Sequence, residues 1–237
     1  MQKYIDAHCH LLDAPDPDLA ISNAQKKGVT AFVCAPATPT QWDDVVGLVN
    51  KFDCVFGVIG VHPWNVSELP QNYIDKLEKL LIKSPKLMVG EIGLDKNHPD
   101  MTRQTDVFIE QLMLAHKLSR GVHLHCVGCW DVVTRILSEN KNTLPPFILA
   151  HGFNGNANDI EKMATAYNMF FSYGPRNLNQ KLGAGRISKT PLSRILVESD
   201  GTDSTIIPSV VSRISEILDM ENTILSDIIY QNTKQII

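Results

Sequence analysis

The sequence predicts an α/β fold of the (β/α)8 TIM-barrel class, in which some distortion of the barrel is allowed. Eight short apolar segments rich in β-branched and aromatic residues recur along the 237 residues, and longer segments with helical spacing lie between them. The same alternation is typical of an open, doubly wound sheet. That alternative is disfavoured because no glycine-rich phosphate-binding turn follows the first apolar segment.

The predicted helices and strands follow from residue spacing. Segment 103–119 places its apolar side chains on one stripe of a helix, and segment 73–84 also has helical spacing. Seven helices are expected between the strands, and further helical material is expected after the last strand. The eight predicted strands are residues 3–8, 29–35, 54–62, 86–94, 121–126, 147–153, 169–174 and 194–200.

The composition indicates one ordinary globular domain. The chain is 43% hydrophobic and 20% charged, and no Pro/Gly/Ser linker, low-complexity tract or charge block divides it. We therefore expect residues 1–237 to form a single domain. The net charge of -4 provides no general basic field for nucleic acid, although a local basic rim or metal ions could still hold phosphates.

The sequence also favours a cytoplasmic location. The first residues lack a secretory pattern, and no apolar run approaches the length of a membrane span, so no membrane partner is expected. The five cysteines are an odd number and are expected to be reduced thiols. Cys126 and Cys129 form a C-x-x-C motif, but a redox or zinc role is a minor alternative because no second such motif accompanies it.

The first predicted strand carries a possible metal-ligand pattern. In "YIDAHCHLLD", His8 and His10 are two residues apart, so in a strand they point to the same face as Asp6. Three such polar groups on one face need partners if they are buried. From this segment alone, a metal site and an ordinary polar turn are equal alternatives.

Position within the predicted barrel favours the metal site. In a TIM barrel the carboxyl ends of the strands converge on one face, where active sites are built. Each polar residue taken alone could be a hydrogen-bonding histidine or a helix cap. Their shared position at or near strand ends indicates a joint site that contains His8, His10, His62, Glu91, His125, His151 and Asp200.

These residue types favour hydrolysis assisted by divalent ions. Imidazoles and carboxylates bind zinc or other borderline divalent ions, and a carboxylate can bridge two of them. The set exceeds the needs of one four-coordinate ion, so we expect two ions about 3.5–4 Å apart. Because no thiolate belongs to the set, an open catalytic site is expected rather than a closed structural one.

The chain resembles the TatD-like metal-dependent hydrolases of the amidohydrolase-like superfamily over nearly its whole length. Seven motifs carry the resemblance, in this order: "DAHCHL", "GVHPWN", "GEIGLD", "HLHC", "LAHGFNGN", "LVESDG" and "QNTKQI". The resemblance implies a distorted TIM barrel with one to three divalent ions (Zn²⁺, Mg²⁺ or Mn²⁺), and its best-known activity is that of a deoxyribonuclease, often acting from a DNA 3′ end. It also implies that Glu91 bridges two ions and that Asp200 doubles as the catalytic base. The implied metal ligands are His8, His10, Glu91, His125, His151 and Asp200.

The chain departs from this family pattern around the substrate. Family members carry His-x-Arg where this chain has His125, Cys126 and Val127, so an arginine expected to hold phosphate is missing. The segment "KNHPD" replaces the usual aromatic residue after "GEIGLD", and a shortened segment follows Asp200. These departures keep the implied metal ligands and predict weak nuclease activity.

Three residues near the expected site have less certain roles. His62, directly before Pro63, is expected to contact the substrate, and a hydrogen bond within its own loop is the alternative. Trp64 and Trp130 could each stack on a base or pack within a loop, and the sequence leaves both alternatives open.

The remaining histidines are not expected to bind metal. His98 and His116 belong to a loop and a helix, and His123 is expected to face away from His125 if the fifth strand is regular.

The leading functional hypothesis is an enzyme that hydrolyses a phosphodiester in DNA, or a small phosphoester, with metal-activated water. A small-molecule amidohydrolase or esterase on the same barrel is the alternative. Its mononuclear and lysine-bridged variants are weakened because Glu91, and no lysine, stands near the end of the fourth strand. A catalytically weakened metal-binding module is the third hypothesis, although such a module has no need of a base such as Asp200. A monomer is expected.

Overall fold

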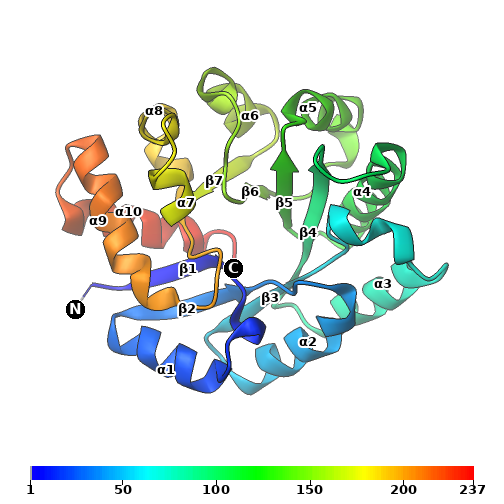
Figure 1. Cartoon of the computed structure of the whole chain (residues 1–237), viewed down its shortest axis with the longest axis horizontal. Coiled ribbons are helices and arrows are strands. Elements are labelled where there is room, and N and C mark those ends of the chain that lie inside the picture. Colours follow the sequence, from blue (N-terminus) through cyan, green and yellow to red (C-terminus); the bar gives the residue numbers. More distant parts are fainter. Residues whose placement is uncertain (1) are drawn as a thin grey trace.

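The predicted barrel is present in the computed structural model, which describes residues 2–237. Eight parallel strands form one sheet in the order β1 to β8, and each strand pairs with the next along the chain (Figure 1). Each strand overlaps its predicted segment. The bounds are β1 Tyr4–Cys9, β2 Val29–Cys34, β3 Val55–Ile59, β4 Leu87–Asp95, β5 Val122–Val127, β6 Ile148–Ala150, β7 Met169–Tyr173 and β8 Ile195–Val197.

Helices surround the strands and cover their outer faces (Figure 1). The two helices expected from spacing are α3 and α4, and α3 buries Leu77, Leu80 and Leu81 on its inner side. None of the helices within residues 2–237 combines the length and the apolar character that a membrane span requires. The bounds are α1 Pro17–Lys26, α2 Trp42–Lys51, α3 Tyr73–Lys83, α4 Met101–Lys117, α5 Trp130–Glu139, α6 Ile160–Ala166, α7 Pro175–Leu178, α8 Gly183–Lys189, α9 Ile207–Leu218 and α10 Asn222–Lys234.

The barrel is distorted where β8 meets β1. Within residues 2–237 the ladder of paired strands runs from β1 to β8, and no ladder joins β8 back to β1. Two backbone hydrogen bonds bridge this seam just beyond β8. The Asp200 N–H donates to the His8 carbonyl oxygen at 3.1 Å, and the His10 N–H donates to the Gly201 carbonyl oxygen at 2.8 Å. The seam therefore ties the β1 histidines directly to Asp200.

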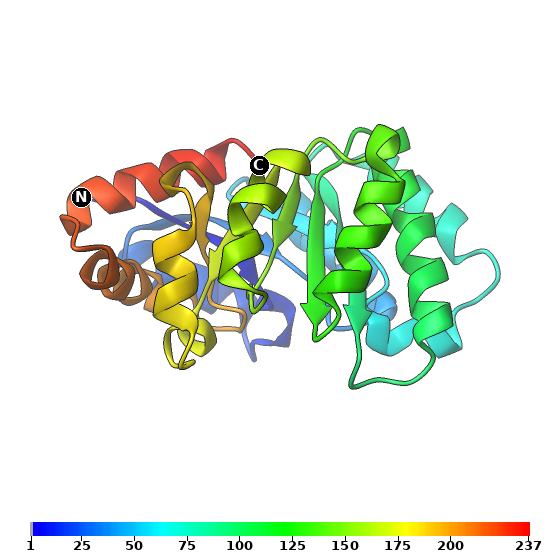
Figure 2. The ribbon, with the colours of Figure 1, turned by 90° about the horizontal axis from the view of Figure 1, so that it is seen from above.

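The C-terminal segment covers the opposite end of the barrel. Figure 2 shows the C-terminus on the side away from the arrowheads of the green strands β4 and β5. Ile236 is buried there in an apolar cluster with Ala7, Leu149, Phe170 and Leu196. The C-terminal segment does not cover the carboxyl ends of the strands, which form the other end of the barrel and carry the predicted site residues.

Candidate metal centre

The predicted site residues converge at the carboxyl end of the barrel, as expected. They come from six of the eight strands or from the residues that directly follow them. The strands and their residues are β1 with His8 and His10, β3 with His62, β4 with Glu91, β5 with His125, β6 with His151, and β8 with Asp200.

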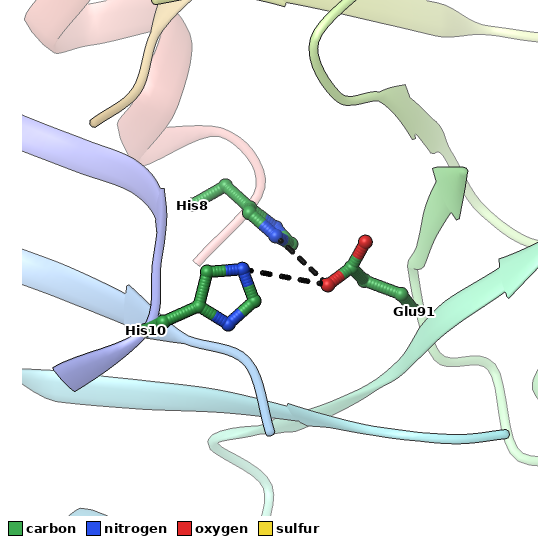
Figure 3. A group of neighbouring side chains, drawn as sticks. All are labelled: His8, His10 and Glu91. Carbon is green, nitrogen blue, oxygen red and sulfur yellow. Dashed lines mark ion pairs between the residues drawn. The ribbon is translucent and has the colours of Figure 1, made fainter. Parts of the chain in front are cut away.

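Glu91 is the central side chain and is only 5% exposed. Its Oε1 lies 3.3 Å from Nε2 of His8 and 3.7 Å from Nε2 of His10 (Figure 3). Its Oε2 lies 2.8 Å from Nε2 of His151 and 3.7 Å from Nδ1 of His125. Each carboxylate oxygen therefore faces at least two imidazoles, which is the arrangement a carboxylate needs to bridge two cations.

Two glycines allow β4 to carry Glu91 against β5. A Cβ atom on Gly90 would lie 2.7 Å from Cβ of His123, and one on Gly93, whose φ is +143°, would lie 1.9 Å from the carbonyl oxygen of His125. Both contacts are too close for any side chain. The glycines of "GEIGLD" thus let the two backbones approach until Glu91 and His125 meet.

Asp200 stands beside His10 across the seam. Its Oδ1 lies 3.5 Å from Nε2 of His10. Its φ of +48° falls in the left-handed region, which aspartate tolerates better than most residues, and its N–H is held by the His8 carbonyl oxygen. This backbone brings a second carboxylate to the side of Glu91 that His8 and His10 occupy.

His62 presents a hydrogen-bond donor to the centre. Its Nδ1 accepts a hydrogen bond from the Trp64 backbone N–H at 3.2 Å. Burial lowers the pKa of His62 to about 3, so the ring is neutral and its proton is on Nε2, which faces Oε2 of Glu91 at 3.9 Å. His62, Glu91 and His125 form one of the groups that could hold an ion. This tautomer, however, favours donation to a bound ligand over coordination.

Two carboxylates lie behind the histidines of β5 and β6. Oδ2 of Asp95 is 3.5 Å from Nε2 of His125, and Oε1 of Glu198 is 4.0 Å from Nδ1 of His151. A carboxylate behind a metal-binding imidazole fixes its orientation and raises its basicity. The sequence reasoning missed both residues. Asp95 ends the motif "GEIGLD", and Glu198 could have been found by its spacing of two residues before Asp200.

The expectation that His123 faces away from His125 is wrong. Residues two apart on a strand share a face, and His123 is fully buried with its Nδ1 3.1 Å from Nδ1 of His8. Among residues 2–237, none of the groups able to hold an ion includes His123. It contacts the ring of His8 on the side away from Glu91.

Glu91 and Asp200 stay ionised, whereas burial raises the pKa of Glu198, behind His151, to about 8. Burial by itself would raise the pKa of Glu91, but His151 and His8 hold that pKa well below its usual range. Burial likewise opposes ionisation of Asp200, yet the hydrogen bond with His10 brings its pKa to about 2. Burial lowers the pKa of His8, whereas Glu91 overcomes burial and raises that of His151 to about 10. A cation bound at Glu91 would compete with the proton on His151.

The donor set shows that divalent ions fit this site. Among the described residues, Nε2 of His8 is buried without a hydrogen bond and faces Glu91. Such orphaned atoms are rare in protein interiors. Imidazole and carboxylate donors suit Zn²⁺ and Mn²⁺, and carboxylates suit Mg²⁺. The three groups whose donor atoms lie within 4.8 Å of one another are His8–His10–Glu91, His8–His151–Asp200 and His62–Glu91–His125.

A pocket of about 240 Å³ opens beside these residues. His125, His151 and Asp200 form part of its wall, and so does Val127, at the position where the family carries arginine. Arg176 of α7 is the one arginine that the described residues place in the pocket wall, where they place no lysine, and its Nη1 lies 3.9 Å from Oδ2 of Asp200. The pocket therefore has an arginine from α7, although the fifth strand has none.

A (β/α)8 barrel that gathers histidines and carboxylates at the carboxyl ends of its strands is the architecture of a metal-dependent hydrolase. The chain belongs to the TatD-related DNase family, whose profile matches residues 5–237, and it is a metal-dependent hydrolase.

Individual relatives agree with this assignment. The chain is 26% identical over 245 residues to an uncharacterised metal-dependent hydrolase of Methanocaldococcus jannaschii, with 98% of this chain and 95% of the relative covered. It is 28% identical over 195 residues to the 3′-5′ ssDNA/RNA exonuclease TatD of Erwinia tasmaniensis, with 79% and 74% covered. The crystal structure of YjjV, a TatD homologue from Escherichia coli, matches the fold with a TM-score of 0.90 at 22% identity, with 98% and 97% covered.

Proposed function

We propose that this hydrolase cleaves phosphodiester bonds in DNA and removes nucleotides from a 3′ end. The observation that carries the proposal is the arrangement around Glu91, whose two oxygens each face two or more imidazoles while Asp200 and the pocket lie alongside. Two metal sites sharing a carboxylate suit in-line displacement at phosphorus. The proposal is also supported by the relative named a 3′-5′ ssDNA/RNA exonuclease.

Two divalent ions, drawn from Zn²⁺, Mg²⁺ and Mn²⁺, would be held on the two sides of Glu91. When bound, such ions supply Lewis acidity and activate water for attack on the phosphorus. One side offers His8, His10 and Asp200, and the other offers His125 and His151.

The two catalytic carboxylates have different tasks in this proposal. Asp200 is ionised and partly exposed at the pocket, so it can accept the proton of the attacking water and pass it toward the leaving group. Glu91 is almost fully buried among the histidines, so it binds ions and has no open path to the substrate. Asp200 is therefore assigned as the general base.

His62 and Arg176 are assigned to the substrate. The Nε2–H of His62 faces the centre and can donate to a phosphate oxygen. Arg176 lies in the pocket wall and, as a guanidinium, can grip a phosphate with two donors. Together they would hold the scissile phosphate from two sides, the first from the β3 loop and the second from α7.

A turnover screen tests the proposal. Purified protein is assayed with Mn²⁺, Mg²⁺ or Zn²⁺ on single-stranded DNA labelled at the 5′ or the 3′ end, on cyclic nucleotides and on amides. We expect metal-dependent release of mononucleotides from the 3′ end. Turnover of amides alone would overturn the proposal in favour of a small-molecule amidohydrolase or esterase, and bound metal without any turnover would favour a metal-binding module.

The proposal also covers the domain organisation, the oligomeric state and the location of the enzyme. Residues 1–237 act as one catalytic domain and as a monomer, and the enzyme works in the cytoplasm on DNA or small phosphoesters. The cytoplasmic location is supported by the five cysteines, all of which are free. Cys126 and Cys129 keep their Sγ atoms 3.9 Å apart.

A further inference from the structure

Trp64 holds an exposed indole at the edge of the metal centre. Its side chain is 57% exposed, and it is the one aromatic residue among the large hydrophobic residues that the described part of the chain leaves exposed. Trp130, the other candidate for stacking, is partly buried against Phe153 and donates to Asn154. The sequence left stacking on a base and packing within a loop open for both tryptophans. Of the two, Trp64 is the one whose ring is exposed to solvent.

The Trp64 ring is held rigidly although it is exposed. Its Nε1–H donates to Oδ2 of Asp95 at 2.8 Å, and the ring of His98 stacks on it at 4.6 Å between centroids and 22° between planes. The ring also lies edge-on to His62, with centroids 4.7 Å apart. Packing into the core does not account for this arrangement, because the contacts fix the indole while leaving most of it in water.

The position of the ring links it to the reacting phosphate. The centroid of Trp64 is 6.3 Å from that of His125, and Asp95 contacts both rings. His62, the donor assigned to a phosphate oxygen, contacts the Trp64 ring and also faces Glu91 through its Nε2. If the phosphate of a nucleotide lies at the metal centre, the base of the same nucleotide can therefore reach the indole of Trp64.

We propose that Trp64, backed by His98, is a stacking platform for the nucleobase of the nucleotide whose phosphate lies at the metal centre. The inference rests on the proposed function and names the part of the substrate that the β3 and β4 loops recognise. Stacking on an aromatic side chain accepts any base, because every base has a π-face. The platform therefore gives affinity for nucleotides without sequence preference.

The test compares two ligands that share a phosphate and differ by a base. Dissociation constants are measured by calorimetry with Mn²⁺ for thymidine 5′-monophosphate and for 2-deoxyribose 5-phosphate. Wild type is expected to bind the nucleotide at least about fivefold more tightly. Trp64→Leu is expected to abolish this preference, whereas Trp64→Phe keeps a ring and should retain most of it. Both variants lose the hydrogen bond to Asp95, so the comparison isolates the aromatic face.

Indole fluorescence gives a second reading. Bound thymidine monophosphate should quench part of the wild-type emission, and the Trp64→Phe variant, which keeps Trp42 and Trp130, should lose that quenching. An unchanged preference in Trp64→Leu, or no binding of the nucleotide by wild type, would overturn the platform. Its failure is distinct from that of the proposed function. A Trp64-dependent preference without DNA hydrolysis would support the platform alone, and DNA hydrolysis with no such preference would support the nuclease alone.

Discussion

The role of each histidine depends on what its second ring nitrogen contacts. Nδ1 of His62 is occupied by a backbone N–H, so its Nε2 carries a proton and can only donate. Nδ1 of His8 meets a neutral ring nitrogen of His123 instead, and it can donate there while Nε2 keeps a free lone pair toward Glu91. Two histidines at the same centre are thereby suited to different tasks, substrate contact and metal binding.

Asp200→Asn tests the general base. Asparagine retains an oxygen for a cation and for the contact with His10, but it cannot take a proton. We expect a folded protein that keeps most of its metal and loses turnover by about 10²-fold or more. Metal content is measured by elemental analysis and turnover on labelled single-stranded DNA. Near-normal turnover with metal bound would show that the proton goes elsewhere, and Glu91→Gln would be the next variant.

At the scale of elements, one buried side chain reinforces the β8–β1 seam beside the two backbone hydrogen bonds that bridge it. Oδ1 of Asp6 accepts hydrogen bonds from the backbone N–H of Ser199 at 3.0 Å and of His8 at 3.3 Å, and Oδ2 accepts from the Ser204 hydroxyl at 2.7 Å. The Asp6 carboxylate therefore connects β1 to the residues that follow β8, where no ladder of backbone hydrogen bonds joins the two strands. It also positions the backbone that leads to Asp200.

Asp6→Ala should open this seam. The variant leaves the N–H groups of Ser199 and His8 without their acceptor in the interior, so we expect the free energy of unfolding to fall by about 2–5 kcal/mol. Turnover should fall as Asp200 loses its support. Asp6→Asn is the matched control, because its oxygen can still accept from both N–H groups while its amide donates to Ser204. Urea denaturation measures the effect, and equal stability of the two variants would contradict the role given to Asp6.

Helix α7 supplies the cation that β5 lacks. Arg176 and Val127 line the same pocket, so an arginine at either position could hold a phosphate there. Arg176→Gln should lower kcat/KM on single-stranded DNA by about tenfold or more, since a charge-assisted hydrogen bond to phosphate is lost. Val127→Arg should raise activity in wild type and restore it in Arg176→Gln.

The control for this prediction is Arg135→Gln, which removes an exposed arginine from α5, where it pairs with Glu139. If Arg176→Gln behaves like Arg135→Gln, the pocket cation has no part in phosphate binding. If Val127→Arg adds nothing in either background, the pocket does not hold the phosphate at all.

At the scale of the whole molecule, the sequence predicted the strands better than the contacts between them. It indicated seven intervening helices, whereas the described chain has eight, because α7 and α8 both lie between β7 and β8. All eight strands and the convergence of the site residues followed from apolar periodicity and from the geometry of a parallel barrel. The partners behind the histidines were not predicted: the spacing of Glu198 before Asp200 was a usable signal, but the pairing of Asp95 with His125 and of Glu198 with His151 appears only in their distances. Arg176 was missed because it reaches the pocket from helix α7 and not from the fifth strand, where the family pattern has its arginine.

Metal binding should stabilise the entire barrel, because the residues around Glu91 come from strands spread along the whole chain. Ions that bind only the folded state stabilise it by about 2.7 kcal/mol at a hundredfold excess over Kd, which for a chain of this size raises Tm by roughly 5–10 °C. We expect this rise when Mn²⁺ or Zn²⁺ is added to chelator-treated protein in a thermal-unfolding experiment. The His8→Ala, His10→Ala double variant should show a much smaller rise and lower metal content, whereas His116→Ala, on α4 away from the centre, should behave as wild type. A folded double variant with unchanged metal stoichiometry and the full rise in Tm would remove His8 and His10 from the ligand set and leave only the His125 and His151 side of Glu91 as a candidate.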